Sequence, residues 1–355
     1  MKPEFTEKLL EWNRTANHRE MPWKGERNPY RIWLSEVILQ QTRVDQGIKY
    51  YIRFLESYPT IRDLAIASDE QVYKLWEGLG YYSRCRNLLA TARRITEEFN
   101  GEFPSNYEAL KQLKGIGPYT AAAISSFAFD QPVAVVDGNV LRIIARYFGI
   151  STPVDTAQGK KLFQDLANAM LDVTAPAIYN QAIMDFGATV CKPQPLCEIC
   201  IQRVDCEAFK HGFVKEVPVK EKAIIRKNRW LYYFILHSGD EFIIRKRTEN
   251  DIWQNLHEFV LLESSVIIDD PSPFYEFLKT FLGRSEFLIS HISKSYKQQL
   301  THQTIHGKFI DVILSSPVNP GADYMKVSYK QLKKLAFPGF INAYLRLKNS
   351  RTTLP

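Results

Sequence analysis

Four of the five cysteines in this 355-residue chain lie between residues 191 and 206, in the segment CKPQPLCEICIQRVDC with spacing C-x5-C-x2-C-x5-C. The first residues, MKPEFTEKLLEW, carry both charge signs and no apolar core. We therefore expect no secretory signal and a cytoplasmic protein whose thiols stay reduced. Four reduced thiols so close together indicate either a metal centre or a redox role, which constrains how this loop can fold.

The candidate metal ligands are Cys191, Cys197, Cys200 and Cys206. Four thiolates can bind either zinc or an iron–sulfur cluster. Zinc sites more often contain two short C-x2-C pairs, and this segment contains only one. Both centres stay open on spacing alone. The fifth cysteine, Cys85, stands apart and is interpreted as a small buried side chain.

The pattern of apolar residues divides the chain into two domains. Residues 1–210 repeat apolar side chains at helical spacing, which predicts an all-α domain that ends with the cysteine loop. Residues 211–229 are charged, contain Pro218 and are interpreted as a linker. Residues 230–350 are predicted to form an α+β domain, with strands at 230–236, 242–247 and 308–314 and a helix at 273–283.

A carboxyl group stands inside an apolar helix at residues 31–42, RIWLSEVILQQT. On a helical wheel the apolar residues cover nearly the whole circumference, and Glu36 falls between Ile32 and Trp33. Burial there should raise the pKa of Glu36 and make it a proton donor near neutral pH. A structural glutamate paired with an arginine is the alternative.

Two further motifs follow along the chain. The segment LKGIGPYTAAAI, residues 113–124, has the helix, Gly-apolar-Gly turn and helix of a helix-hairpin-helix. Gly115 and Gly117 permit a close backbone approach to an anion such as a DNA phosphate, although a plain turn between packed helices fits as well. In VVDGNV, Asp137 is either a helix cap or a second carboxylate. Paired carboxylates in unlike environments suit glycosidic cleavage.

A basic surface would suit nucleic acid as a partner. Residues 78–96 contain no acidic residue and carry Arg84, Arg86, Arg93 and Arg94 together with Tyr81 and Tyr82. Basic groups interleaved with aromatics are typical of nucleic-acid surfaces, although a solvated helix face gives the same pattern. The longest uncharged stretch, 115–129, is too short to span a bilayer, so we expect no membrane association.

Taken together, WLSEVILQQT, LGYYSR, LKGIGPYTAAAI, VVDGNV and the cysteine loop closely resemble the MutY family of adenine DNA glycosylases, in the helix-hairpin-helix superfamily that includes endonuclease III. The resemblance implies a [4Fe-4S] cluster at the four cysteines. It also implies removal of adenine mispaired with 8-oxoguanine or guanine, with Glu36 protonating adenine N7 and Asp137 stabilising the sugar cation. Tyr119 and Asn139 would support these carboxylates.

The same resemblance assigns roles in DNA and adenine binding to three further residues. Gln41 and Tyr81 match positions that probe the DNA helix at the lesion, and Gln181 matches one that lines the adenine pocket. Relatives that also cut the backbone use a lysine Schiff base where this chain has Tyr119. The resemblance therefore implies base release with little or no lyase activity.

The C-terminal domain resembles the Nudix-like domain of the MutY family through IWQNLHEFVLLE at 252–263. The cluster of catalytic glutamates of the Nudix box is missing after this segment. We therefore expect this domain to bind 8-oxoguanine without hydrolysing a substrate. The family's lesion-contacting Phe-Ser-His is matched to Thr304, Ile305 and His306, in which only the histidine is kept.

We therefore expect a base-excision repair glycosylase that acts as a monomer on double-stranded DNA, associated with the nucleoid if the source is bacterial. Two alternatives are an endonuclease III-like enzyme for damaged pyrimidines and a lesion-binding protein without catalysis. Tyr119 and the second domain argue against the first alternative. The presence of both Glu36 and Asp137 argues against the second.

Overall fold

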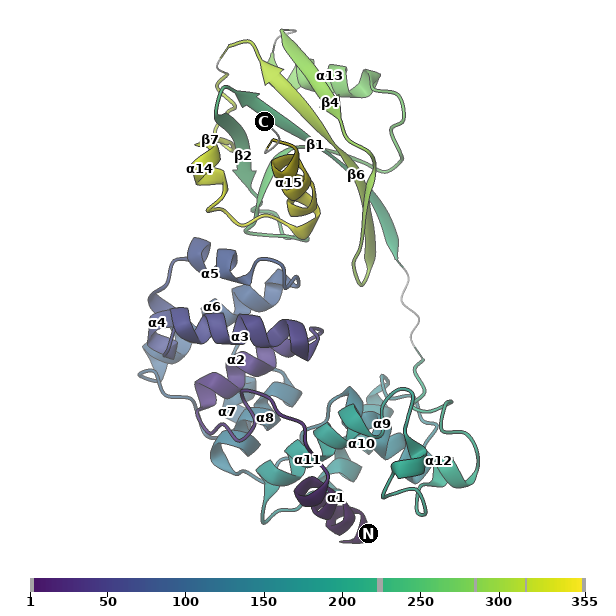
Figure 1. Cartoon of the computed structure of the whole chain (residues 1–355). Helices are drawn as coiled ribbons and strands as arrows, with labels where there is room; N and C mark the ends of the chain where they lie inside the picture. Colours follow the sequence, from purple (N-terminus) through teal and green to yellow (C-terminus); the bar gives the residue numbers. More distant parts are fainter. Residues whose placement is uncertain (1–2, 222–225, 284–285, 317, 353–355) are drawn as a thin grey trace. The chain divides into compact units, whose positions relative to one another are not determined.

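The computed structural model describes residues 3–221, 226–283, 286–316 and 318–352 (Figure 1). Contacts divide the chain into two compact units. The helical unit comprises Met1–Ile66 and Arg86–Ala223, and the sheet unit comprises Ala67–Cys85 and Ile224–Pro355. Residues 222–225 of the expected linker lie outside the described residues.

The helical unit contains no strand among its described residues, as the sequence predicts. Within the described part of the chain, no helix is long and apolar enough to cross a membrane. The helices of this unit are α1 (Pro3–Thr15), α2 (Pro29–Leu39), α3 (Val44–Ser57), α4 (Ile61–Ile66), most of α6 (Tyr82–Glu98), α7 (Tyr107–Lys111), α8 (Pro118–Phe129), α9 (Gly138–Phe148), α10 (Ala157–Met170), α11 (Pro176–Thr189) and α12 (Glu207–Lys210), with a 3₁₀ turn at Cys197–Ile199.

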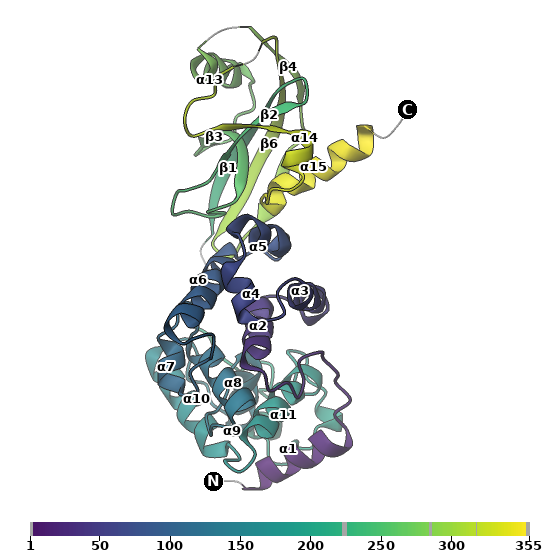
Figure 2. The same cartoon turned by 90° about the vertical axis from the view of Figure 1, so that its left-hand side faces the viewer.

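Two groups of helices make up the helical unit. Helices α1, α9, α10 and α11 lie together in both views (Figures 1 and 2) and enclose a core that contains Phe163 and Phe186. In this core the rings of Phe5 and Tyr147 meet edge to face, with centroids 4.7 Å apart. Helix α2 packs against α3 and α8 in the other group. Helix α11 contacts both α9 and α8, so it joins the two groups.

The sheet unit is built on seven strands among its described residues, in the order β4-β6-β1-β3-β2-β7, with β5 paired to β6. Strands β1 and β6 are parallel and the other pairs are antiparallel. The strands are β1 (Lys227–Ser238), β2 (Glu241–Lys246), β3 (His257–Ser264), β4 (Phe287–Ile292), β5 (Tyr296–Gln299), β6 (Gln303–Leu314) and β7 (Met325–Ser328). Its helices are α5 (Asp69–Trp76), α13 (Ser272–Leu282), α14 (Tyr329–Leu332) and α15 (Gly339–Thr352).

Strand β1 is buried on both faces. On one face the Phe234 ring packs against Phe274 of α13, with centroids 5.7 Å apart. On the other face the ring centroids of Tyr233 and of Phe340 of α15 lie 6.3 Å apart. A strand covered on both sides needs no polar alternation, which explains the apolar run WLYYFIL. The predicted strands at 230–236, 242–247 and 308–314 and the helix at 273–283 are confirmed.

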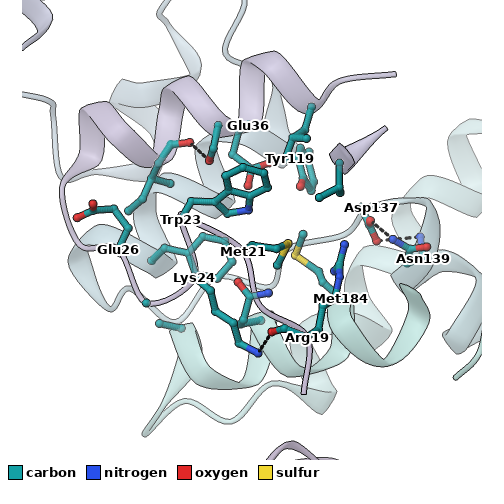
Figure 3. Close-up of a pocket in the computed structure, with 18 of the residues that line it drawn as sticks. Arg19, Met21, Trp23, Lys24, Glu26, Glu36, Tyr119, Asp137, Asn139 and Met184 are labelled. Atoms are coloured by element: carbon teal, nitrogen blue, oxygen red, sulfur yellow. Dashed lines mark hydrogen bonds between the residues drawn. The ribbon is translucent and has the colours of Figure 1, made fainter. Parts of the chain in front are cut away.

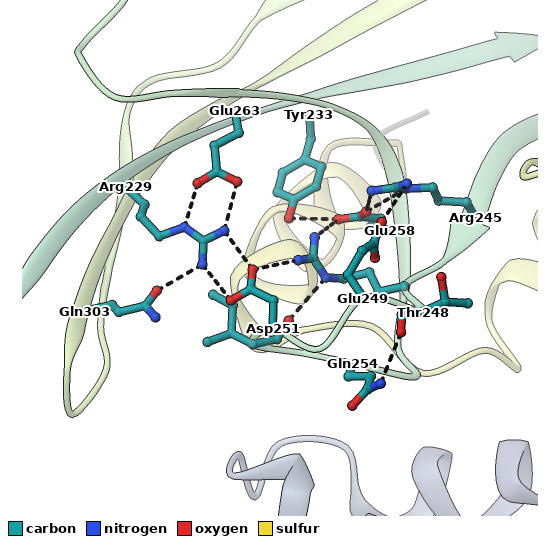
Figure 4. Close-up of polar contacts among 12 residues, drawn as sticks. Arg229, Tyr233, Arg245, Thr248, Glu249, Asp251, Gln254, Glu258, Glu263 and Gln303 are labelled. Carbon is teal, nitrogen blue, oxygen red and sulfur yellow. Dashed lines mark hydrogen bonds and ion pairs between the residues drawn. The ribbon is translucent and has the colours of Figure 1, made fainter.

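An ion-pair network joins the first three strands of the sheet unit (Figure 4). Glu258 is fully buried and accepts hydrogen bonds from Arg247 (2.6 Å) and Arg245 (2.8 Å). Asp251 pairs with Arg247 at 3.1 Å and with Arg229 at 2.7 Å. Arg229 also pairs with Glu263. Each carboxylate of this network is therefore matched by at least one arginine.

Candidate active site

A cavity of about 470 Å³ opens in the helical unit, a volume usual for small-molecule sites. Its walls come from α2, α8, α9 and α11 and from the segment between α1 and α2 (Figure 3). Residues far apart in the sequence therefore meet here. The residues singled out from the sequence that line it are Glu36, Tyr119, Asp137, Asn139 and Gln181.

Helix α2 carries Glu36 to the cavity wall. The helix starts cleanly because Pro29 occupies its first turn and the Asn28 side chain accepts hydrogen bonds from Tyr30 N and Arg31 N. Most of the helix is buried, and Glu36 is only 6% exposed. Among the described residues, no lysine or arginine forms an ion pair with it. The expected alternative, a glutamate paired with an arginine, is therefore wrong for these residues.

Burial raises the pKa of Glu36 to about 7. A hydrogen bond from the Tyr119 hydroxyl opposes this rise, and the negative charge of Asp137 adds to it. Burial also raises the pKa of Tyr119 well above 10, so its hydroxyl stays a neutral donor. Glu36 can therefore hold a proton near neutral pH and still face a cavity, as the helical wheel predicts.

Asp137 is both the helix cap and a cavity residue. Its carboxylate accepts hydrogen bonds from Asn139 N and Val140 N, each at 2.8 Å, at the start of α9. The Asn139 amide donates to the other oxygen at 2.7 Å. Burial raises the pKa of Asp137, while these hydrogen bonds and Arg142 oppose the rise. The three donors and the helix N-terminus favour the ionised form.

The turn between α7 and α8 requires glycine at Gly115. Its φ is +80°, and an added Cβ would lie 2.7 Å from the Cβ of Asn87. Gly117 is exposed and precedes α8 as an N-cap without a side-chain hydrogen bond. The exposed start of α8 thus has the geometry of an anion site. Neither glycine lines the cavity.

Gln41 and Tyr81 lie outside the cavity lining. Both have positive φ, +55° for Gln41 and +46° for Tyr81, which is uncommon for residues other than glycine. Such strained, exposed residues cluster at functional sites. In the sheet unit, the Tyr81 hydroxyl lies 2.6 Å from the hydroxyl of Thr301 on the turn between β5 and β6.

His306 lies on β6 in the sheet unit. Its ring stacks on Trp230 with centroids 5.4 Å apart, and its Nε2 lies 3.2 Å from Asn228 Oδ1. Thr304 and Ile305, which the resemblance matched to lesion contacts, are 8% and 0% exposed. Because strand pairing buries both side chains, they are not available to a ligand. Sequence reasoning missed Thr301, which stands at the turn instead.

Not every arginine of the expected basic surface is exposed. Arg84 is 8% exposed, and its guanidinium lies over the rings of Trp76 (5.2 Å) and Tyr81 (5.4 Å). Burial lowers the pKa of Arg84 to about 10. Arg94 pairs with Glu98 on the same helix. Arg84 thus braces the segment that presents Tyr81, and the acid-free run in the sequence does not reveal this.

The four cysteines of the loop line one small hollow together with Arg146. Among the described residues, no three potential ligands lie close enough to hold a single metal ion. Zinc needs all four sulfurs about 2.3 Å from one point, whereas an iron–sulfur cluster binds its thiolates at separate irons. The hollow therefore gathers the four thiols that either centre would use.

The loop is partly buried and is anchored by an arginine. Burial raises the pKa of Cys206, and raises that of Cys200 to about 12, so these thiols need a metal's positive charge to ionise. Arg146, 3% exposed, donates to Lys192 O (2.6 Å) and Pro193 O (3.0 Å), which fixes the start of the loop. Cys85 is fully buried, as expected.

Sequence reasoning also missed the segment between α1 and α2 and its anchor. Trp23 and Lys24 line the cavity, and Arg19 lines it while pairing with the fully buried Asp185 of α11 at 2.7 Å. A signal was available for Asp185 only, as a charged residue within a mostly apolar helix.

Comparisons with known proteins identify relatives of this chain. Residues 34–169 match the family described as HhH-GPD superfamily base excision DNA repair protein. The adenine DNA glycosylase of Buchnera aphidicola subsp. Baizongia pistaciae is 34% identical over 258 residues, which cover 72% of this chain and 73% of that protein. The adenine DNA glycosylase of Mus musculus is 45% identical over 217 residues, 58% of this chain and 42% of that protein.

Solved structures show the same helical fold. A thermostable thymine-DNA glycosylase aligns with a TM-score of 0.54 and 30% identity, over 58% of this chain and 95% of that one. An endonuclease III–DNA complex aligns with a TM-score of 0.51 and 23% identity, over 60% of this chain and 98% of that one. On the strength of its sequence relatives, the chain belongs to the adenine DNA glycosylase family, the MutY family, of the HhH-GPD superfamily.

Proposed function

We propose that the chain is a monofunctional DNA glycosylase that hydrolyses the N-glycosidic bond of adenine opposite 8-oxoguanine or guanine. The observation that carries the proposal is the pair of unlike carboxyl groups on one cavity, Glu36 and Asp137. Adenine within a duplex must be flipped out to reach such a cavity, at a cost of a few kcal/mol that a mispair lowers.

Glu36 supplies the proton. Neutral adenine is a poor leaving group, and protonation at N7 makes it a good one. With a pKa of about 7, Glu36 is protonated in a large share of molecules at neutral pH. The Tyr119 hydroxyl keeps its own proton, because burial raises its pKa, and its interaction with Glu36 lowers the pKa of that carboxyl. Positioned general acids of this kind contribute about a hundredfold to ten-thousandfold.

Asp137 acts on the sugar. Positive charge develops on the deoxyribose as the bond to adenine breaks, and a fixed carboxylate stabilises that charge. The hydrogen bonds from Asn139 and the start of α9 hold Asp137 in one orientation before the reaction starts. Preorganisation of this kind avoids the cost of reorienting solvent.

We further propose that base release is not followed by efficient strand cleavage. A lyase needs an amine to form a Schiff base with the sugar, and the helix that follows the hairpin turn carries Tyr119 at the corresponding position. Treatment with borohydride in the presence of abasic DNA should therefore trap little covalent complex. Efficient trapping would show that another amine acts as nucleophile.

The cysteine loop is assigned to a [4Fe-4S] cluster held by Cys191, Cys197, Cys200 and Cys206. When bound, the cluster would cross-link the loop through iron–thiolate bonds, and no chemical step of base release is assigned to it. A brown colour and bound iron in purified protein would support this assignment, and stoichiometric zinc would contradict it.

The sheet unit is assigned to recognition of the base opposite adenine. Its exposed Tyr81 and the neighbouring Thr301 bring two hydroxyl groups together, and hydroxyls can both donate to and accept from a modified base. We place His306, stacked on Trp230, at the edge of this surface. The partner is double-stranded DNA, bound by one copy of the chain.

Single-turnover kinetics test the proposal directly. Adenine release is measured from matched duplexes that differ only in the opposite base, 8-oxoguanine, guanine or thymine. We expect release opposite 8-oxoguanine and guanine and little opposite thymine. Release of an oxidised pyrimidine or of mispaired thymine instead would replace the adenine assignment, and tight binding without any release would indicate a lesion-binding protein.

A further inference from the structure

A third buried carboxylate lies beside the cavity, and base release as proposed above does not use it. Asp185 of α11 is fully buried and does not line the cavity. It accepts hydrogen bonds from Arg19 (2.7 Å) and Asn17 (2.9 Å), and Lys24 lies 3.1 Å away. Arg19 and Lys24 belong to the cavity wall. Asp185 thus sits behind the wall and holds parts of it.

The fourth partner of Asp185 is Gln181, one turn earlier on the same helix. The Gln181 Nε2 donates to Asp185 Oδ1 at 3.0 Å. A reversed amide would set the Gln181 oxygen against a carboxylate oxygen, so the carboxylate permits one orientation only. Among the described residues, none donates to Gln181 Oε1. Because Gln181 lines the cavity, an acceptor remains there for a ligand.

We propose that Asp185 is a positioning residue for base selectivity. It orients the Gln181 amide so that Gln181 Oε1 accepts a hydrogen bond from the 6-amino group of a purine in the cavity. The inference rests on the proposed function, because it takes a flipped purine as the ligand. A 6-oxo purine, hypoxanthine, would place its own carbonyl oxygen against Gln181 Oε1. Two acceptors face each other in that case, and neither has a donor.

A purely structural role predicts something different. Asp185 ties the segment around Arg19 and Lys24 to α11, so its loss would loosen the cavity for every base. Release of adenine and of hypoxanthine would then fall together. The ratio of the two rates therefore separates a positioning role from a structural one.

The test measures single-turnover release of adenine and of hypoxanthine from otherwise identical duplexes with 8-oxoguanine opposite. The full-length chain is used as purified, as wild type, Gln181→Leu, Asp185→Asn and the double variant. Gln164→Leu is the matched control, because Gln164 is a half-buried helical glutamine that hydrogen-bonds to Ala134 O and does not line the cavity.

We expect the wild type to prefer adenine. Gln181→Leu and Asp185→Asn should each lower the ratio of adenine to hypoxanthine rates about tenfold, the value of one hydrogen bond. The double variant should lower it no further than Gln181→Leu alone, because Asp185 acts through Gln181. Gln164→Leu should keep the wild-type ratio.

Equal loss of both rates in Asp185→Asn, or an unchanged ratio in Gln181→Leu, would overturn the inference. If Asp185→Asn does not fold, Asp185→Glu keeps the negative charge but displaces the oxygen from Gln181, and the same fall in the ratio is required. A wild type that releases neither base would overturn the proposed function as well. Adenine release with unaltered ratios would overturn only the role of Asp185.

Discussion

Each unit of this protein buries a glutamate, and the two glutamates have opposite surroundings. Glu36 in the helical unit is 6% exposed, faces a cavity and forms no ion pair with a described cation. Glu258 in the sheet unit is fully buried between Arg245 and Arg247 (Figure 4). Burial alone therefore does not decide what a carboxyl group does.

The difference lies in how each unit compensates the desolvation of its acid. A buried carboxyl group without a cation keeps its proton and can donate it. A buried carboxylate between two guanidinium groups is an ion and ties strands together. The first arrangement sacrifices stability for reactivity, and the second fixes the geometry of a sheet. Four predictions test this distinction.

The largest effect is expected for Glu36→Gln. The amide keeps the shape of the side chain but cannot protonate adenine, so release should fall at least about a thousandfold in single-turnover assays. Glu26→Gln is the matched control, because Glu26 also lines the cavity but the hydrogen bonds it receives lower its pKa. Wild-type rates in Glu36→Gln, or an equal loss in both variants, would contradict the role of Glu36.

Glu258→Gln should destabilise the sheet unit strongly. The change leaves Arg247, only 4% exposed, with a single remaining carboxylate partner, and breaking a buried pair costs about 3–5 kcal/mol. Urea unfolding measures the loss. Glu263→Gln is the control, since the Glu263 side chain is 42% exposed and should cost far less. Similar losses in both variants would show that burial does not set the value of these pairs.

The stability of the helical unit should depend on the protonation of Glu36. Its pKa is about 4.5 when unfolded and about 7 when folded, so its contribution is full below pH 4.5 and is lost as pH rises through 7. The loss approaches about 3 kcal/mol. The Glu36→Gln variant should not show this loss of stability. Its free energy of unfolding in urea should therefore rise relative to wild type between pH 4.5 and pH 8. A pH-independent difference would mean that Glu36 is ionised when folded.

The smallest effect is expected for Arg229→Gln. Its partners Asp251 and Glu263 have side chains that are 30% and 42% exposed, so water can replace much of the lost ion pair. We expect a loss of about 1 kcal/mol in urea unfolding, with little change in adenine release by the folded protein. A loss as large as that of Glu258→Gln would place Arg229 with the buried part of the network.

The sequence was sufficient for features that depend on local pattern. Glu36 could be found because the residues around it on one helix are apolar, and Asp137 because a capping residue precedes a helix. Strands β1, β2 and β6 follow from β-branched and aromatic runs, whereas β3, β4, β5 and β7 were not predicted. Each of these signals lies within a dozen residues of the feature that it predicts.

Features that depend on contacts distant in the sequence could not be predicted. Nothing near residue 19 announces that Arg19 meets Asp185, and nothing in LTHQTIH distinguishes the buried Thr304 from Thr301 at the turn. The grouping of residues 67–85 with the C-terminal half also arises only when the chain folds. These positions are set by register and packing across the fold.

Helix α2 is enclosed on nearly its whole circumference, and this limits how the reaction can begin. Apart from the face that lines the cavity, the helix is packed against its neighbours, so it cannot rotate or slide without opening the core and Glu36 stays where folding put it. Under the proposed function, the displacement that a rigid α2 does not supply belongs to the nucleic acid, whose nucleotide must swing out of the stack. On that proposal, local melting of the mispair, and not movement of α2, should limit how often Glu36 can deliver a proton.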